Sequence, residues 1–316
     1  MSILITGAAG FIGFHTARAL KTARVFGLDN FNPYYSVELK RKRAALLREE
    51  GIEIIEGDIR DKSKLLELFD AHSITHVIHL AAQAGVRYSL KHPEAYVQAN
   101  IEGFLSILEA VRAYPHIKLI YASSSSVYGL NEKIPFATSD RTDHPASFYG
   151  VTKKTNELMA AAYHHLFQLD VCGLRFFTVY GPWGRPDMAY FSFTESIVEN
   201  RPIDLYHQGK CERDFTYIDD IVEGIKGSLQ LPRGHHLFNL GNHRPVKLSY
   251  FVEILENLLG KKAQVRSLPL QSGDIVATWA DIEESQKRLG FYPKVSIEEG
   301  LARFVEWYKE CYPKKS

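Results

Sequence analysis

The chain has 316 residues, enough for one large domain or two medium ones. Its 38 Lys and Arg residues balance 37 Asp and Glu, and this net charge of +1 does not suggest a nucleic-acid-binding protein, which usually has a basic face. The three cysteines, Cys172, Cys211 and Cys311, form no C-x-x-C pair and predict neither a disulfide framework nor a metal site.

Residues 2–7 (SILITG) have the pattern of a core strand, so we expect no signal peptide before the fold. No uncharged apolar run reaches the roughly 18 residues that a membrane span needs. A protein that does not contact the membrane and works in the cytoplasm is therefore expected.

The first half alternates short apolar runs with helical patterns, which is typical of a parallel sheet covered on both faces. The runs predict strands at 2–7, 24–29, 53–58, 76–82, 118–124 and 171–177. Helical periodicity predicts helices at 13–20, 36–50, 61–71, 93–113 and 148–168. We expect a doubly wound α/β (Rossmann) fold, in which ligands bind at the carboxyl ends of the strands.

After residue 178 the pattern changes to that of a smaller α+β lobe. A Gly/Pro loop at 181–187 comes first. The later patterns predict helices near 188–200, 219–230, 248–259 and 296–311, and strands near 203–206 and 236–240. We predict a Rossmann domain over 1–178 and a mainly substrate-binding lobe over 179–316, with segments such as 214–235 as candidates to return to the first domain.

Three glycines, Gly7, Gly10 and Gly13, follow the first strand and open the first helix. Glycines there permit a tight turn and let the backbone approach a pyrophosphate. The helix start, with Phe11 and Ile12, then offers free N–H groups to the anion. The spacing is G-x-x-G-x-x-G instead of the usual G-x-G-x-x-G, but its place between a strand and a helix favours a dinucleotide site.

Asp29 ends the second strand, 22 residues after Gly7. A carboxylate there suits ribose hydroxyls and repels a 2′-phosphate, so NAD is favoured over NADP; a simple turn aspartate is the alternative. Asn30 beside it is a further cofactor candidate. Asp58 and Ile59 end the third strand, where adenine contacts are usual.

Tyr149 and Lys153 lie one turn apart at the start of a predicted helix, so their side chains share a face. A free tyrosine has a pKa of about 10, and an ammonium 4 Å away attracts the phenolate by about 4 kcal/mol. We expect Lys153 to lower the pKa of Tyr149 toward neutrality, giving a general base. Of the serines that end the fifth strand, Ser124 and Ser126 are candidates to bind the substrate oxygen and relay its proton.

Six motifs between residue 3 and about residue 290 resemble those of extended short-chain dehydrogenases/reductases of the nucleotide-sugar epimerase type. They are GAAGFIG, HLAAQAGVRYS, SSSSVYG, YGVTK, LRFFTVYGPWGRPDMA and RDFTYIDD. Within this group the sequence is most similar to UDP-glucuronate 4-epimerases. The resemblance implies an NAD-dependent isomerase of UDP-sugars, and a homodimer formed through the helices near 93–113 and 148–168.

The resemblance also implies roles at matching positions. Tyr149 is the base that takes the proton of the sugar 4-OH, Lys153 also binds the nicotinamide ribose, and Ser124 matches the active-site Ser/Thr, with Ser126 also facing the sugar. The residues that would border the cofactor are Leu80, Ala81, Ala82 and Asn100.

Arg213 and Asp274 would hold the UDP phosphates and ribose. Gln271 departs from the Arg that UDP-galactose epimerases often have three residues before that Asp, which puts a galactose-type assignment in doubt. Dehydratases and decarboxylases of this type have an acidic residue after the strand-five Ser/Thr. Here Ser125 and Ser126 follow, which leaves return of hydride to the other face of the sugar.

Arg185 in GPWGRPD is the residue that we expect to recognise the substrate, because a guanidinium binds a carboxylate with two parallel hydrogen bonds. Bracing of the loop is the alternative role. Thr178 would assist by hydrogen bonding, and Arg87 and Ser89 are candidate second contacts to the sugar.

The sequence therefore predicts 4-epimerisation of UDP-glucuronate to UDP-galacturonate. Two alternatives remain at this stage. One is a 4-epimerase for neutral sugars such as UDP-glucose or UDP-N-acetylglucosamine. The other is a non-catalytic dinucleotide-binding protein, which the intact Tyr149 and Lys153 pair disfavours.

Overall fold

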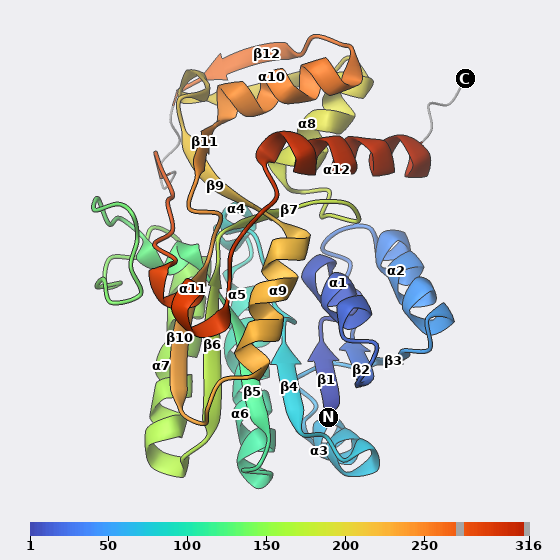
Figure 1. The fold of residues 1–316 in the computed structure, drawn as a ribbon, viewed down its shortest axis with the longest axis vertical. Helices are drawn as coiled ribbons and strands as arrows, with labels where there is room; N and C mark the ends of the chain where they lie inside the picture. The colour runs from blue at the N-terminus through green and yellow to red at the C-terminus, as the bar shows by residue number, and fades with distance from the viewer. Residues whose placement is uncertain (270–274, 313–316) are drawn as a thin grey trace.

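A seven-stranded parallel sheet forms the centre of the molecule (Figure 1), whose computed structural model describes residues 1–269 and 275–312. The strand order is β10-β6-β5-β4-β1-β2-β3. Strands β2 and β3 are therefore added on one side of β1 and strands β4, β5 and β6 on the other, which makes a topological switch point between β1 and β4. This confirms the expected doubly wound fold. The strands are β1 (Ser2–Thr6), β2 (Arg24–Asp29), β3 (Glu53–Glu56), β4 (His76–His79), β5 (Lys118–Ser124), β6 (Asp170–Phe176) and β10 (His235–Leu240).

Successive residues of a strand point to opposite sides of the sheet, so apolar strands place apolar side chains on both faces. Helices bury both faces. Ile3 and Ile5 of β1 belong to one buried cluster and Leu4 to another. The first cluster includes residues of α1 (Phe11–Ala19), α2 (Val37–Glu49) and α9 (Ile218–Leu229). The second includes residues of α3 (Lys62–His72), α6 (Gly103–Ala113) and α7 (Phe148–Phe167).

The helix predicted over 93–113 has three parts in the structure. It begins as α5 (Pro93–Tyr96), continues through one π-helical segment, Val97–Glu102, and ends as α6. Asn100 lies in the π-helical segment and is buried. A short helix, α4 (Val86–Ser89), precedes this stretch and was not predicted.

A smaller lobe stands at the carboxyl ends of the sheet strands, at the top of Figure 1. Two small sheets form its β part, of order β11-β9-β7 and β12-β8. These strands are β7 (Thr178–Tyr180), β8 (Pro202–Tyr206), β9 (Glu212–Tyr217), β11 (Pro245–Lys247) and β12 (Gln264–Leu268). The helices of this lobe are α8 (Ala189–Val198), α10 (Leu248–Leu259) and α12 (Ile297–Cys311). Helix α11 (Glu283–Leu289) instead packs against α9 and β10 of the main sheet.

One predicted strand lies in a different part of the fold from the one expected. The strand near 236–240 was assigned to the smaller lobe, but as β10 it pairs in parallel with β6, from His235 beside Val171 to Leu240 beside Phe176. Its buried residues Phe238 and Leu240 extend the main apolar core, which explains the placement. The division at residue 178 stays a prediction.

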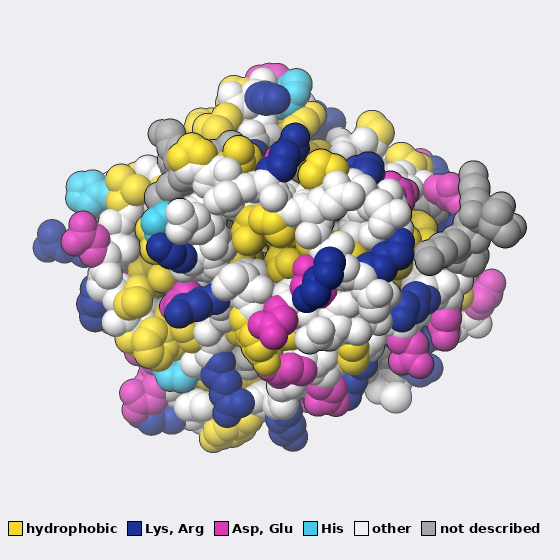
Figure 2. Space-filling view, turned by 90° about the horizontal axis from the view of Figure 1, so that it is seen from above, with side chains coloured by type: hydrophobic (Ala, Val, Ile, Leu, Met, Phe, Trp, Pro, Cys, Tyr) yellow, Lys and Arg dark blue, Asp and Glu magenta, His cyan; other side chains and the backbone are white. Residues whose placement is uncertain are grey.

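The surface over the smaller lobe mixes charges of both signs (Figure 2), with Lys and Arg side chains next to Asp and Glu. None of the helices in the described part of the chain combines the length and the apolar character needed to cross a bilayer.

Candidate active site

A cavity of about 960 Å³ lies where the carboxyl ends of the sheet strands meet the smaller lobe. Its wall contains residues from both parts of the fold and brings together most of the residues singled out in the sequence. These are Gly7, Gly10, Phe11, Ile12, Gly13, Asp29, Asn30, Asp58, Ile59, Leu80, Ala81, Ala82, Arg87, Ser124, Ser126, Tyr149, Lys153, Thr178, Arg185 and Arg213.

Three predicted residues are not in this wall. Asp274 lies outside the described residues. Ser89 Oγ donates to the Val86 carbonyl and accepts from the N–H of Tyr149 at 3.3 Å. Asn100 Nδ2 donates to the Gln83 carbonyl and to Thr152, at 3.0 Å each. The side chains of Ser89 and Asn100 thus brace the loop after β4 against α7.

The turn between β1 and α1 can pack this tightly against its own backbone and the end of β4 only because it contains glycine. A Cβ at Gly13 would lie 2.1 Å from the Gly7 carbonyl oxygen, and one at Gly7 would lie 2.7 Å from the nitrogen of Ala81. Gly7 also has a φ of +70°, which side chains rarely adopt. No side chain caps α1 at Gly10, so its first N–H groups can bind an anion. The arrangement fits a dinucleotide diphosphate.

Asp29 ends β2 and also braces this glycine loop. Its Oδ2 accepts from the N–H of Ala9 at 3.0 Å and its Oδ1 from the N–H of Phe31 at 2.8 Å. Burial raises the pKa of Asp29, against the effect of these bonds and of the Lys40 charge. Carboxylate oxygens have further lone pairs, so Asp29 can still accept from ribose hydroxyls.

Tyr149, Ser124 and Lys153 meet where β5 ends and α7 begins. Ser147 caps α7 by accepting from the N–H of Gly150, which sets Tyr149 in the first turn. Burial raises the pKa of Tyr149, whereas a hydrogen bond with Ser124 and the charge of Arg185 lower it. A phenol that shares a hydrogen bond with a serine at a cavity wall can exchange a proton with a bound alcohol.

Lys153 is buried and bonded to the end of β5. Its Nζ donates to the Ala122 carbonyl at 2.8 Å, and burial lowers its own pKa to about 8. Burial raises the pKa of Tyr149, and Ser124 and Arg185 oppose this effect. The lowering of this pKa by the Lys153 ammonium stays a prediction.

A buried ion pair that was not predicted lies behind these residues. Glu157, one turn after Lys153, accepts from Arg175 Nε and Nη2 at 2.8 Å each, and from Ser123 Oγ at 2.6 Å. Its charge also opposes the lowering of the Lys153 pKa. The i, i+4 spacing from Lys153 was the one available signal in the sequence.

Arg185 already has a carboxylate partner, which was also missed. Its Nε and Nη2 donate to the two oxygens of Asp187, and Tyr34 Oη donates to Asp187 Oδ2 at 3.0 Å. Two other cavity cations contact protein groups as well. Arg87 lies 4.8 Å from the centre of the Tyr206 ring, and Arg213 Nη1 donates to the Glu212 carbonyl at 2.9 Å.

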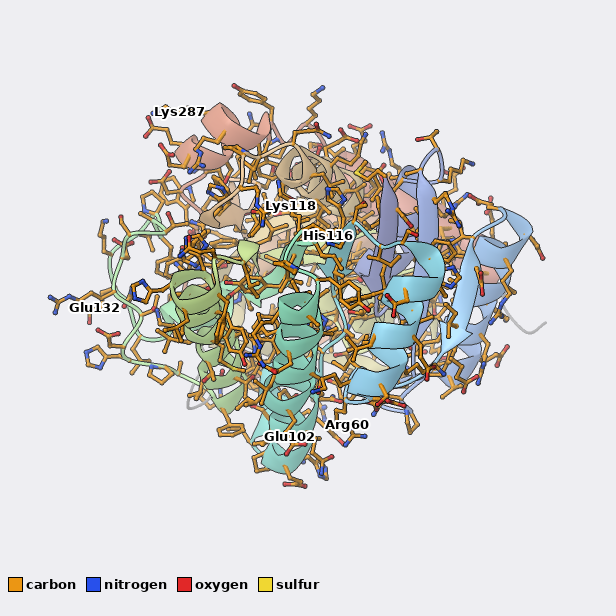
Figure 3. The ribbon with its side chains drawn as sticks, turned by 90° about the horizontal axis from the view of Figure 1, so that it is seen from below. Arg60, Glu102, His116, Lys118, Glu132 and Lys287 are labelled. Atoms are coloured by element: carbon orange, nitrogen blue, oxygen red, sulfur yellow. The ribbon has the colours of Figure 1, made fainter. Side chains whose placement is uncertain are left out.

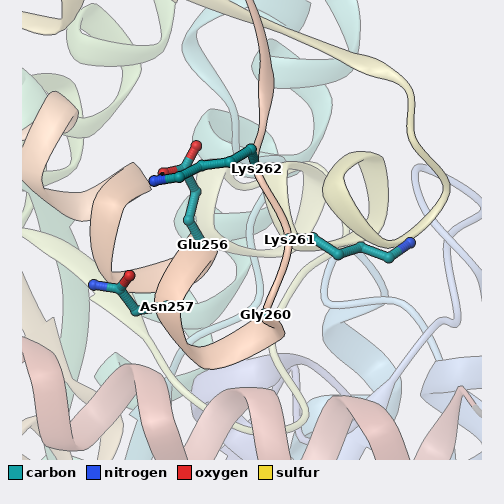
Figure 4. Close-up of a pocket in the computed structure, with 5 residues that line it drawn as sticks. All are labelled: Glu256, Asn257, Gly260, Lys261 and Lys262. Carbon is teal, nitrogen blue, oxygen red and sulfur yellow. Dashed lines mark hydrogen bonds and ion pairs between the residues drawn. The ribbon is translucent and has the colours of Figure 1, made fainter.

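A second and much smaller hollow, of about 250 Å³, lies beside the end of α10 (Figure 4). Lys262 pairs with Glu256 at 2.6 Å, and Lys261 donates to the Val198 carbonyl at 2.7 Å. Both lysines of this hollow thus already have protein partners, and the candidate catalytic residues line the large cavity instead.

Comparison with known proteins agrees with this site. The model of the NAD dependent epimerase/dehydratase family matches residues 3–241. The chain belongs to this family. Among its family relatives, UDP-glucuronate 4-epimerase 2 of Arabidopsis thaliana is 49% identical over 332 aligned residues, covering 99% of this chain and 76% of the relative. Protein CapI of Staphylococcus aureus is 46% identical, covering 99% of this chain and 100% of the relative.

Solved structures of family members have the same fold. UDP-glucuronic acid 4-epimerase from Bacillus cereus, in complex with UDP-glucuronic acid and NAD, is 36% identical with a TM-score of 0.91, covering 99% of this chain and 100% of that one. UDP-glucose 4-epimerase of Thermotoga maritima, with UDP-glucose, is 30% identical with a TM-score of 0.90, covering 98% and 99%. The fold of this chain is thus that of its family relatives.

Proposed function

We propose that this chain is an NAD-dependent 4-epimerase that interconverts UDP-glucuronate and UDP-galacturonate through a 4-keto sugar. The observation that supports it best is the cavity wall itself. A phenol paired with a serine, Tyr149 and Ser124, shares this cavity with the guanidinium of Arg185 and the glycine loop. An alcohol and a carboxylate of one sugar can therefore be held in a single site. The similarity to UDP-glucuronate 4-epimerases supports the same substrate.

The proposed division of labour follows from these positions. The chemistry that bound NAD supplies is reversible hydride exchange with C4 of the sugar. Tyr149 takes the proton of the 4-OH and returns it after the keto sugar has turned its other face, and Ser124 holds the phenolate by hydrogen bonding. Lys153, Asp29 and the glycine loop are proposed to hold the cofactor, and Arg213 to anchor the UDP part during the turn.

Loss of water or carbon dioxide is disfavoured at this site. β5 ends at Ser124, and Ser125 and Ser126 begin a short 3-10 helix, so no carboxyl group follows Ser124 directly to expel a hydroxyl or to act as a second acid. The test is product chromatography after incubation with UDP-glucuronate, UDP-glucose and UDP-N-acetylglucosamine. We expect the epimer of UDP-glucuronate to form fastest, and faster turnover of a neutral sugar would contradict the proposal.

Replacing Arg185 with alanine is expected to lower kcat/KM for UDP-glucuronate by roughly 10- to 100-fold, the effect of losing one or two charge-assisted hydrogen bonds. Turnover of UDP-glucose should fall much less, because it has no carboxylate. As a control, Arg201→Ala removes an exposed guanidinium that pairs with Glu195 and Glu199. Equal losses for both sugars in Arg185→Ala would remove Arg185 as the carboxylate-binding residue.

We also propose that the protein forms a homodimer through α6 and α7, which lie side by side (Figure 3). These helices expose large apolar side chains, of which Leu158 is 59% and Leu166 65% exposed. Sedimentation equilibrium should give twice the chain mass of 35.9 kDa. Leu158→Glu should weaken the dimer, whereas Leu130→Glu, at a residue that is 64% exposed in the loop after β5, should not. A monomeric parent protein would contradict this assembly.

A cytoplasmic location is proposed as well. Cys172 and Cys211 are buried free thiols and Cys311 is an exposed one, which suits a reducing compartment. Fractionation of the source cells would test it.

A further inference from the structure

The side chain of Arg185 is held in place by a carboxylate, Asp187, and a phenol, Tyr34, neither of which has a role in the proposed function. Asp187 accepts from two nitrogens of the guanidinium, and Tyr34 donates to the same carboxylate. Tyr34 comes from the loop between β2 and α2, and Asp187 from the loop between β7 and α8. All three side chains lie in the wall of the large cavity, so the contact joins the cofactor side of the site to its substrate side.

This contact fixes the direction in which Arg185 can bind anything else. A guanidinium is planar and rigid, so two bonds to one carboxylate determine the orientation of its remaining N–H groups. Nε and Nη2 donate to Asp187, and a side-chain hydrogen bond between Arg185 and Tyr34 restricts the guanidinium further. A substrate carboxylate therefore meets one edge of Arg185, at one angle.

The loop that carries the pair is itself anchored. The N–H of Arg185 donates to Tyr190 Oη at 3.0 Å, and the fully buried Arg43 donates to the Gly184 carbonyl at 3.0 Å. On the other side, the N–H of Tyr34 donates to Asn32 Oδ1 at 2.9 Å, and its ring packs on Tyr88. The groups are thus preorganised, which is what precise orientation of a ligand requires.

We propose that Asp187, supported by Tyr34, is a positioning residue that decides the fate of the keto sugar by fixing how Arg185 holds the uronate carboxylate. This proposal rests on the proposed function above. A 4-keto uronate loses carbon dioxide when the bond between C5 and the carboxylate aligns with the carbonyl π system. The electron pair of that bond then enters the C4 carbonyl, and C5 later takes a proton from water. A carboxylate held in the plane of the ring cannot align in this way.

Asp187 also limits how tightly Arg185 binds. Its negative charge partly neutralises the guanidinium. Arg185 therefore fixes the orientation of the uronate carboxylate without binding it very tightly. That matters because the keto sugar must release Arg185 and turn over before hydride returns, and binding that is equally strong throughout does not speed the reaction.

The test is the ratio of UDP-pentose to UDP-galacturonate formed from UDP-glucuronate by the full-length, NAD-loaded protein. Asp187→Asn keeps the shape but frees Arg185, and it should raise this ratio about tenfold while changing UDP-glucose turnover less than about twofold, since roughly one charge-assisted bond is lost. Tyr34→Phe should shift the ratio the same way by a smaller factor. Asp140→Asn, which alters a carboxylate paired with Lys133 outside the cavity, should leave it unchanged.

A purely structural role for Asp187 would lower the turnover of both sugars together and leave the product ratio alone. That result, or unchanged ratios in both Asp187→Asn and Tyr34→Phe, would overturn the proposal while leaving the epimerase assignment intact. If the parent protein makes no epimer from UDP-glucuronate, the proposed function falls and this inference falls with it. Should Asp187→Asn fail to fold, the Tyr34→Phe ratio alone decides.

Discussion

Tyr149→Phe is expected to reduce turnover of UDP-glucuronate by about 10²- to 10⁴-fold, the usual contribution of a positioned general base. The substitution removes one oxygen and keeps the ring, whose centre lies 6.0 Å from that of the Tyr96 ring. Burial opposes ionisation of the phenol, and Ser124 and Arg185 favour it. Without the phenol oxygen, none of these effects can assist the departure of the 4-OH proton. The measurement is the initial rate of epimer formation by chromatography.

The matched control is Tyr250→Phe, which removes a phenol that donates to Glu298 on the exposed side of α10. Its rate should equal that of the parent. NAD content, measured by absorbance after denaturation, should also be equal in all three proteins, because the lost oxygen is proposed to act on the sugar. A Tyr149→Phe rate within about threefold of the parent would show that another group moves the proton.

The fold was largely predictable because its elements have strong periodic patterns. The six apolar runs of the first half became six neighbouring strands, and the helix predicted over 36–50 is observed as Val37–Glu49. Short strands such as Pro245–Lys247 were missed, since three residues show no period. β10 was assigned to the wrong part because its pattern indicates a strand but not its partner, which tertiary contacts with β6 decide.

The candidate site was predictable where motifs fix it and unpredictable where two distant segments meet. Gly7, Tyr149 and Ser124 lie in local patterns, and the structure places them in one cavity wall. The contact of Tyr34 with Asp187 joins residues far apart in the chain, so neither segment alone signals it. The burial of Lys153 and its bond to the Ala122 carbonyl were equally hidden, because they depend on how α7 packs against β5.

Glu157→Gln is expected to lower the free energy of unfolding by about 3–5 kcal/mol, the cost of removing one partner of a buried ion pair. The side chain of Arg175 is 2% exposed and that of Glu157 is 5% exposed, so water cannot solvate the guanidinium that the substitution leaves unpaired. A glutamine of the same shape would also turn an amide N–H group toward one of the Arg175 nitrogens. Urea unfolding followed by circular dichroism measures the change.

A double variant distinguishes two costs: the lost attraction within the ion pair, and the burial of an unpaired Arg175 guanidinium. If the unpaired guanidinium is the main cost, Glu157→Gln combined with Arg175→Met should be more stable than Glu157→Gln alone, because an apolar side chain of similar length needs no partner. Glu283→Gln, which breaks an exposed pair with Lys287, should change stability little. A double variant less stable than the single one would mean that Arg175 stabilises the fold through its other contacts, including its position 4.8 Å from the centre of the Tyr128 ring.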